Sequence, residues 1–227
     1  MDRERSMQRA MAMFAVAGAF SLLAATQAGA VDIKVLDDKD GKATVLLSGT
    51  VAVGDGLKVR ATIGALAASK AVTVQLDSAG GNRNEAMSIG QFFHRNRIAT
   101  VIPAKTRCIA PCPLILVGGV GPLSGKASYV KYSTASIGFT GIVLNYQDKS
   151  YTAADLDGAV AGIQRDILLI ADYLHDVGAD MNLLKYYQSV LKSNETRYIS
   201  NEQALDLGIA VMFEETGQLI EPIARRP

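Results

Sequence analysis

The first of two strand-turn-helix patterns constrains the fold of this chain most strongly. Apolar and polar residues alternate over residues 72–77, which predicts a β-strand. The sequence SAGG at 78–81 predicts a turn, and a helical pattern of apolar residues follows over 84–93. Gly80 and Gly81 permit a positive φ and allow another group to approach the backbone closely.

A second pattern of the same kind follows directly. It begins with a strand at 100–102, continues with a turn at 108–111 and ends with a short apolar helix at 113–119. Two successive strand-helix units favour parallel strands joined by right-handed crossovers. The sequence therefore predicts an α/β fold with a mainly parallel sheet.

Three motifs carry a resemblance to a known superfamily. The sequence LDSAGGN at 76–82 resembles the NSPGGS loop of the Clp protease proteolytic subunit. The sequence CIAPC at 108–112 resembles the CASAC segment of periplasmic relatives, and RYISNEQALDLGI at 197–209 matches a third family segment. The resemblance covers most of residues 31–227. It implies one ClpP/crotonase-like domain of repeated β-β-α units around a mainly parallel sheet.

The catalytic positions of that superfamily are occupied here by residues that leave no proton relay. The resemblance places Ala110 at the nucleophilic serine, Thr140 at the histidine and Thr196 at the aspartate. One oxyanion donor of the family is the N–H of the next residue, which here is Pro111 and has no N–H. Losing such a donor costs about 3 kcal/mol of transition-state stabilisation. We therefore expect a pseudopeptidase in which no catalytic residue is intact.

A binding role is the alternative to catalysis that the motifs favour. We expect a groove beside Gly80 and Gly81, with Ser78 and Pro111 also at the binding site, that holds an extended peptide by strand addition. The protein would then act as a peptide-binding or scaffolding subunit, and the resemblance implies a homo-oligomer. No cofactor is expected, and His94 and His175 are too far apart in sequence to suggest a metal site.

Two enzymatic or assembly alternatives stay open. The chain could be a periplasmic serine-peptidase-like hydrolase with a replaced nucleophile, Cys112 or Thr140, or an inactive subunit in a mixed oligomer with an active homologue. Lys126 and Lys131 could imitate the lysine of a Ser-Lys dyad, but with no serine at the turn we favour solvated surface lysines.

Cys108 and Cys112 are the only cysteines. In an oxidising compartment we favour a disulfide between them. Cys108 is expected in a turn, where the two cysteines can come close enough to bond. Two inert thiols, or a reactive Cys112 thiolate at a helix N-terminus, are the alternatives.

The first 30 residues have the composition of a secretory signal. Three arginines precede an apolar run at 11–25, and Ala28 and Ala30 suit a signal peptidase. An uncleaved membrane anchor is the alternative, although the run is shorter than the ~20 residues of a spanning helix. We expect a periplasmic or secreted protein that begins near Val31. Cleavage there leaves 20 basic and 20 acidic residues, which gives no electrostatic case for nucleic acid or an anionic membrane.

A long amphipathic helix is predicted over residues 153–177. The resemblance implies that it contributes to subunit contacts, and a core helix of a monomer is the alternative. Three side chains elsewhere receive structural interpretations: Arg83 as solvated, Tyr187 as packing, and His94 as complementing a helix dipole.

Overall fold

A computed structural model of the chain describes residues 30–121, 129–141, 150–190 and 195–222. The predicted signal segment therefore lies outside the described residues. The elements in chain order are β1 (Asp32–Lys39), β2 (Lys42–Val51), α1 (Asp55–Ala67), β3 (Ala71–Gly81), α2 (Arg83–Arg95), β4 (Ala99–Ile102), β5 (Arg107–Ile109), α3 (Cys112–Val117), β6 (Tyr129–Tyr132), β7 (Ser136–Phe139), α4 (Ala153–Asp176), α5 (Asn182–Val190), β8 (Arg197–Tyr198), α6 (Asn201–Asp206), β9 (Ala210–Phe213) and β10 (Gln218–Ile220).

The long strand β3 is the centre of the sheet. One edge pairs in parallel with β2 along its whole length, from Ala71 to Gly81. The other edge is shared, because β4 pairs with β3 near Val74 and β5 pairs with it at Ser78. The sheet therefore divides into two branches on that side of β3.

Each branch continues outward from β3. One runs β4–β6–β9–β10 and the other runs β5–β7–β8. The pairs β1–β2, β9–β10 and β7–β8 are antiparallel, and the remaining pairs are parallel. The predicted α/β class with a mainly parallel sheet is confirmed.

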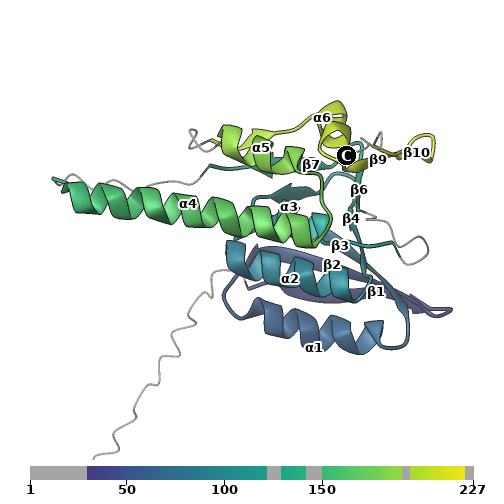
Figure 1. Cartoon of the computed structure of the whole chain (residues 1–227). Coiled ribbons are helices and arrows are strands. Elements are labelled where there is room, and N and C mark those ends of the chain that lie inside the picture. The colour runs from purple at the N-terminus through teal and green to yellow at the C-terminus, as the bar shows by residue number, and fades with distance from the viewer. Residues whose placement is uncertain (1–29, 122–128, 142–149, 191–194, 223–227) are drawn as a thin grey trace, which may run out of the picture.

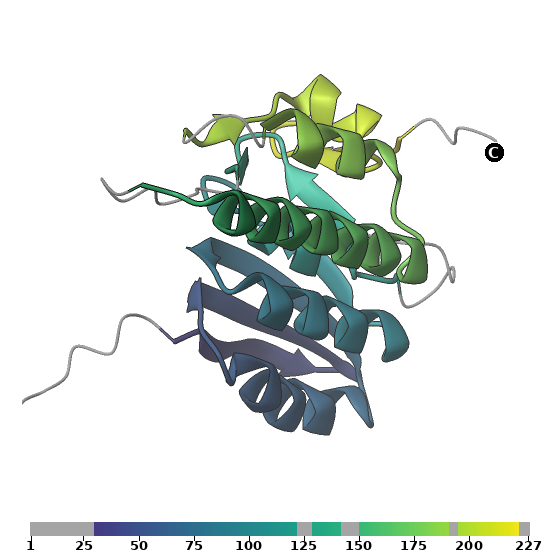
Figure 2. The same cartoon turned by 60° about the vertical axis from the view of Figure 1, so that its left-hand side comes forward.

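The helices α1, α2 and α4 lie beside one another over one face of the sheet (Figures 1 and 2). Alternate residues of β2 and β3, among them Val45, Leu47, Val74 and Leu76, are fully buried, as expected for strands with one packed face. The short helix α3 lies in the interior, where all six of its residues are buried. It begins at the end of β5 and so links the sheet to the pocket described below.

The structure corrects both predicted turns. Ser78 does not end the first strand: β3 continues to Gly81, because β2 supplies partners for its backbone as far as Val51. The second predicted turn contains β5, in which Cys108 pairs with Ser78 and with Ile137 on either side. In both places tertiary strand pairing overrides the local turn preference.

The helix α4 extends beyond the sheet at its N-terminal end (Figure 1). A capping box fixes this end, where the Thr152 hydroxyl accepts from the N–H of Asp155 at 3.2 Å and the Asp155 carboxylate accepts from the N–H of Thr152 at 2.9 Å. Only the second half of the helix is buried, through Ile170, Tyr173 and Leu174. Among the described helices, none is long and apolar enough to cross a membrane.

Candidate functional site

A pocket of about 110 Å³ lies where β3 and β5 end, with residues of α4 and α5 also in its lining. It brings together four of the predicted site residues, Gly81, Ala110, Pro111 and Thr140. The other lining residues are Arg83, Leu114, Gly141, Ile167, Ile170, Leu184, Tyr187 and Gln188. Apolar side chains from α3, α4 and α5 thus form part of its wall.

Ala110 lies at the elbow between β5 and α3. Its N–H donates to the carbonyl of Gly138 at 2.8 Å, and its peptide bond to Pro111 is cis. Pro111 precedes the helix, which begins at Cys112. The elbow therefore presents a methyl group to the pocket where a serine hydrolase would present a hydroxyl.

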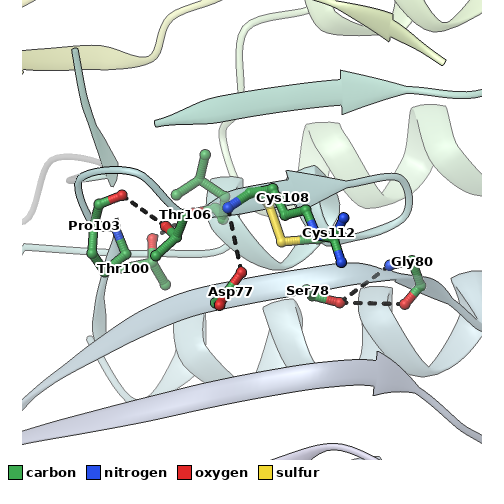
Figure 3. Close-up of a disulfide and its surroundings, with 10 residues drawn as sticks. Asp77, Ser78, Gly80, Thr100, Pro103, Thr106, Cys108 and Cys112 are labelled. Atoms are coloured by element: carbon green, nitrogen blue, oxygen red, sulfur yellow. Dashed lines mark hydrogen bonds between the residues drawn. A yellow bond between two sulfur atoms is a disulfide. The ribbon is translucent and has the colours of Figure 1, made fainter. Parts of the chain in front are cut away.

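A disulfide joins Cys108 to Cys112 across this elbow (Figure 3). Both residues are fully buried, and their Cα atoms are 5.2 Å apart. The bond connects the middle of β5 to the first residue of α3. The favoured prediction of a disulfide is confirmed, and the two alternatives with free thiols, including a reactive Cys112, are wrong for this structure.

Thr140 and Thr196 are placed differently with respect to the pocket. Thr140 directly follows β7, is partly buried and contributes to the wall. Thr196 directly precedes β8 and packs against β7. A Cβ added to Gly138 of β7 would lie 2.6 Å from the Cγ2 atom of Thr196. Thr196 does not line the pocket. Two of the three degenerate positions therefore meet in the pocket, and the third lies beside β7.

Of the motif SAGG at 78–81, only Gly81 lines the pocket, so the predicted site residues Ser78 and Gly80 lie outside its lining. Ser78 is buried, and its hydroxyl interacts with the N–H and carbonyl of Gly80 at 3.4 and 3.3 Å, so it faces the protein interior (Figure 3). Gly80 approaches the elbow, since a Cβ there would lie 3.2 Å from the carbonyl oxygen of Ala110. Gly81 is exposed and lines the pocket.

Strand addition beside these glycines is limited to one edge of β3. On the other edge Thr50 and Val51 of β2 already pair with Gly80 and Gly81. A Cβ on Gly81 would collide with the backbone of Val51, which shows how closely the two strands approach. An added peptide strand must therefore lie on the pocket side.

Arg83 and Tyr187 are pocket residues that the sequence did not reveal. Arg83 is partly buried, and its Nη1 atom donates to Asp166 Oδ2 of α4 at 2.7 Å. It directly follows the helix cap Asn82, whose side chain accepts from the N–H of Glu85. The position of Arg83, one residue after the N-cap of α2, is the sequence signal that could have identified Arg83 as a pocket residue.

Tyr187 is 7% exposed, and its ring packs edge-on against Phe139 with centroids 4.9 Å apart. Its hydroxyl has no hydrogen-bond partner among the described residues. Burial raises the pKa of this hydroxyl, and the nearby charge of Arg83 partly opposes the rise. The predicted packing role is confirmed, and the hydroxyl is in addition a buried donor without a partner among the described residues.

Among the described residues that line the pocket, none can act as a general base near neutral pH. None of its described residues is an aspartate, glutamate, histidine or lysine. The raised pKa of Tyr187 keeps its proton in place. The arrangement can donate hydrogen bonds and enclose an apolar group, but it provides no proton acceptor for a threonine nucleophile.

Lys131 is not a solvated surface lysine, and that prediction is wrong. The residue is 1% exposed, and its Nζ atom donates to Asn201 Oδ1 and, at 3.3 Å, to the carbonyl of Ser133. Its place in β6 turns the side chain inward. Lys131 does not line the pocket, and Lys126 lies outside the described residues.

No group of three or more potential metal ligands occurs within the described parts of the chain. The sequence matches no protein-family model and no curated protein.

Proposed function

We propose that this chain is an exported, non-catalytic peptide-binding protein of the ClpP/crotonase type. One observation carries the proposal: the pocket at the elbow holds Ala110 and Thr140 and has no general base among its described lining residues. A hydrolase of this type needs a nucleophile and a base at that place. In this proposal the pocket binds a peptide and does not cleave it.

The order of the elements supports the superfamily assignment. Two strands precede α3, and two strands precede α4, so the pattern β-β-α occurs twice in succession around a mainly parallel sheet. Ala110 and Thr140 follow neighbouring strands, β5 and β7, at the same end of the sheet. This is where residues from separate motifs would have to meet in an active relative.

The proposed ligand is an extended peptide with one small apolar side chain. A pocket of about 110 Å³ has room for roughly eight water-sized groups, which is more than enough for a side chain of valine or leucine size. Leu114, Ile170 and Leu184 would contact that side chain. The Tyr187 hydroxyl and the Arg83 guanidinium would donate to a peptide carbonyl beside it.

Export is supported by the disulfide. Cys108 and Cys112 form their bond in the structure, and such bonds persist in oxidising compartments. The composition of residues 1–30 supports the same location, with cleavage after Ala30.

Self-association is supported by the exposed half of α4. Leu156 and Val160 are 50% and 53% exposed and lie one turn apart on the face that packs against the protein further along the helix. A second copy of the chain would cover these side chains. This part of the proposal concerns a homo-oligomer.

Peptide binding and hydrolysis can be measured on the same disulfide-bonded protein. We expect anisotropy of fluorescent peptides to show binding to sequences with a central valine or leucine, without turnover and without an acyl adduct by mass spectrometry. Ala110→Leu should fill the pocket and abolish binding. Ala79→Leu is the matched control, because Ala79 is exposed and does not line the pocket. Turnover, or an adduct on Thr140, would contradict the proposal in favour of a hydrolase.

A further inference from the structure

The backbone nitrogen of Val31 lies against a buried carboxylate. It donates to Asp55 Oδ2 at 3.0 Å, and the same oxygen accepts from the N–H of Ala52 at 2.7 Å. Val31 is fully buried and Asp55 is 5% exposed. Among the described residues, no cationic side chain forms an ion pair with Asp55. A buried carboxylate with two amide donors and no cationic partner is unusual, because burial penalises its charge.

Val31 is also the first residue after the expected cleavage site. Cleavage of the Ala30–Val31 peptide bond by water releases the carboxylate of Ala30 and leaves a protonated α-amino group on Val31. The Val31 nitrogen would then carry a positive charge at the position from which it now donates to Asp55. No movement of the chain is required for that contact.

We propose that the fold contains a binding site for its own processed N-terminus, in which the α-ammonium group of Val31 forms an ion pair with Asp55. The inference rests on the proposed export and on cleavage after Ala30. It goes beyond that proposal by assigning a role to Asp55 and by defining the residue at which processing must occur.

Some charged groups around the Val31 nitrogen would oppose an ammonium charge there, and others would favour it. Lys58 Nζ donates to the carbonyl of Val31 at 2.5 Å, so a second cation lies nearby and opposes the ammonium charge. Glu85 of α2 accepts from the N–H of Gly56 at 2.8 Å and adds a negative charge near the start of α1. Asp55 touches the Val31 nitrogen directly, so it has the largest effect of these groups.

The contact connects processing to the peptide pocket. Asp55 also holds Ala52, the residue after Val51, and Val51 pairs with Gly81 at the pocket rim. An ion pair at Val31 would therefore fix the turn between β2 and α1, next to the strand that lines the pocket. Figure 2 shows β1, β2 and α1 together at one end of the molecule.

Three forms of the chain test the ion pair: one that begins at Val31, one that begins at Ala30, and the full chain. At about pH 7 we expect the Val31 form to have a roughly tenfold larger folding equilibrium constant than the Ala30 form, which corresponds to a pKa raised by about one unit. The advantage should be fully present below the unfolded α-amino pKa of about 8 and should disappear as pH rises through the higher folded pKa.

Two further measurements separate this inference from a folding defect. Asp55→Asn should remove the difference between the Val31 and Ala30 forms, whereas Asp32→Asn, a neighbouring exposed aspartate, should preserve it. Where Asp55→Asn does not fold, NMR of the ¹³C-methylated α-amino group in the unchanged Val31 form measures the pKa directly. An unshifted pKa together with equal stabilities of the Val31 and Ala30 forms would overturn the ion pair.

N-terminal sequencing of the exported protein tests the cleavage separately. A first residue of Val31 supports the inference. Any other first residue overturns the role in processing, even where the engineered Val31 form gains stability. Peptide binding by the pocket is measured independently of both results, so its failure is distinguishable from failure of the ion pair.

Discussion

A cluster of polar side chains surrounds Lys131 on the opposite branch of the sheet from β5. Glu214 accepts from the hydroxyls of Ser133 and Thr134 and, at 3.2 Å, from the N–H of Thr134. The hydrogen bond from Ser133, followed by that from Thr134, lowers the pKa of Glu214 to about 2. Burial lowers the pKa of Lys131, and the charges of Glu214 and Glu202 partly offset this shift. Glu214 thus both fixes the turn after β6 and supports a buried lysine.

The lowered pKa of Glu214 predicts an acid-dependent loss of stability. Its folded pKa of about 2 lies below the ordinary value of 4.5, so its contribution is present above pH 4.5 and is lost as pH falls toward 2. Glu214→Gln should lower the free energy of unfolding near neutral pH, and the difference from the unchanged protein should vanish near pH 2. Urea unfolding across this range measures the effect. The exposed neighbour Glu215, changed to Gln, is the control, and a difference independent of pH would contradict the assignment.

Among the elements, the elbow between β5 and α3 depends on its disulfide. Cys108 and Cys112 are four residues apart, and closing so short a loop stabilises the folded state by about 2 kcal/mol in the chain-entropy description. Reduction should therefore lower the free energy of unfolding by about 2 kcal/mol. Urea unfolding with and without a reductant, with thiol counting by mass spectrometry, measures this change.

The variant with both Cys108→Ala and Cys112→Ala is the control for that experiment, because its unfolding should not respond to the reductant. An unchanged midpoint for the reduced natural protein would contradict the stabilising role of the bond.

The pairing of β3 with β2 makes Gly81 the most constrained position at the pocket rim. Its φ is 130°, and a Cβ would lie within 2.5 Å of the Val51 nitrogen. Gly81→Ala should cost about 3 kcal/mol, since strain and a backbone collision act together. Thermal and urea unfolding measure the loss. Gly41→Ala is the matched control: Gly41 has a φ of 70° but no neighbour within 4 Å, so only its backbone strain applies. Equal losses for both variants would rule out the collision with β2.

At the scale of the whole molecule, α4 separates into a buried half and an exposed half. Ile170 and Leu174 pack in the core, and Leu156 and Val160 continue the same face beyond the sheet. Fully burying a side chain of this size stabilises by about 1.5–3 kcal/mol. The exposed half therefore has enough apolar area to contribute to an interface between copies.

Replacing Leu156 and Val160 by aspartate should weaken self-association by at least about 100-fold, because two apolar contacts are lost and charge enters the interface. Light scattering after size-exclusion chromatography measures the association. The matched control replaces Ala161 and Gln164 by aspartate, which adds the same charge on the exposed side of the helix. A natural protein that is monomeric at all accessible concentrations would contradict the interface.

The sequence by itself determined the class of the fold and four of the twelve residues that line the pocket. Alternating strands and periodic helices are local signals, so the α/β class and the place of the elbow could be predicted from residues 72–119. The motifs, together with the family resemblance, identified Gly81, Ala110, Pro111 and Thr140, which the structure brings together in one pocket. The cysteine spacing was sufficient to favour the disulfide.

Only the tertiary structure decided how far the strands extend and which polar groups are buried. Gly80 and Gly81 remain in β3 because β2 pairs with them from another part of the chain. Lys131 carries no local signal of its burial, since other elements of the fold cover it. The contact between Val31 and Asp55 joins residues 24 positions apart. Such contacts depend on packing between distant segments, and no local sequence pattern specifies them.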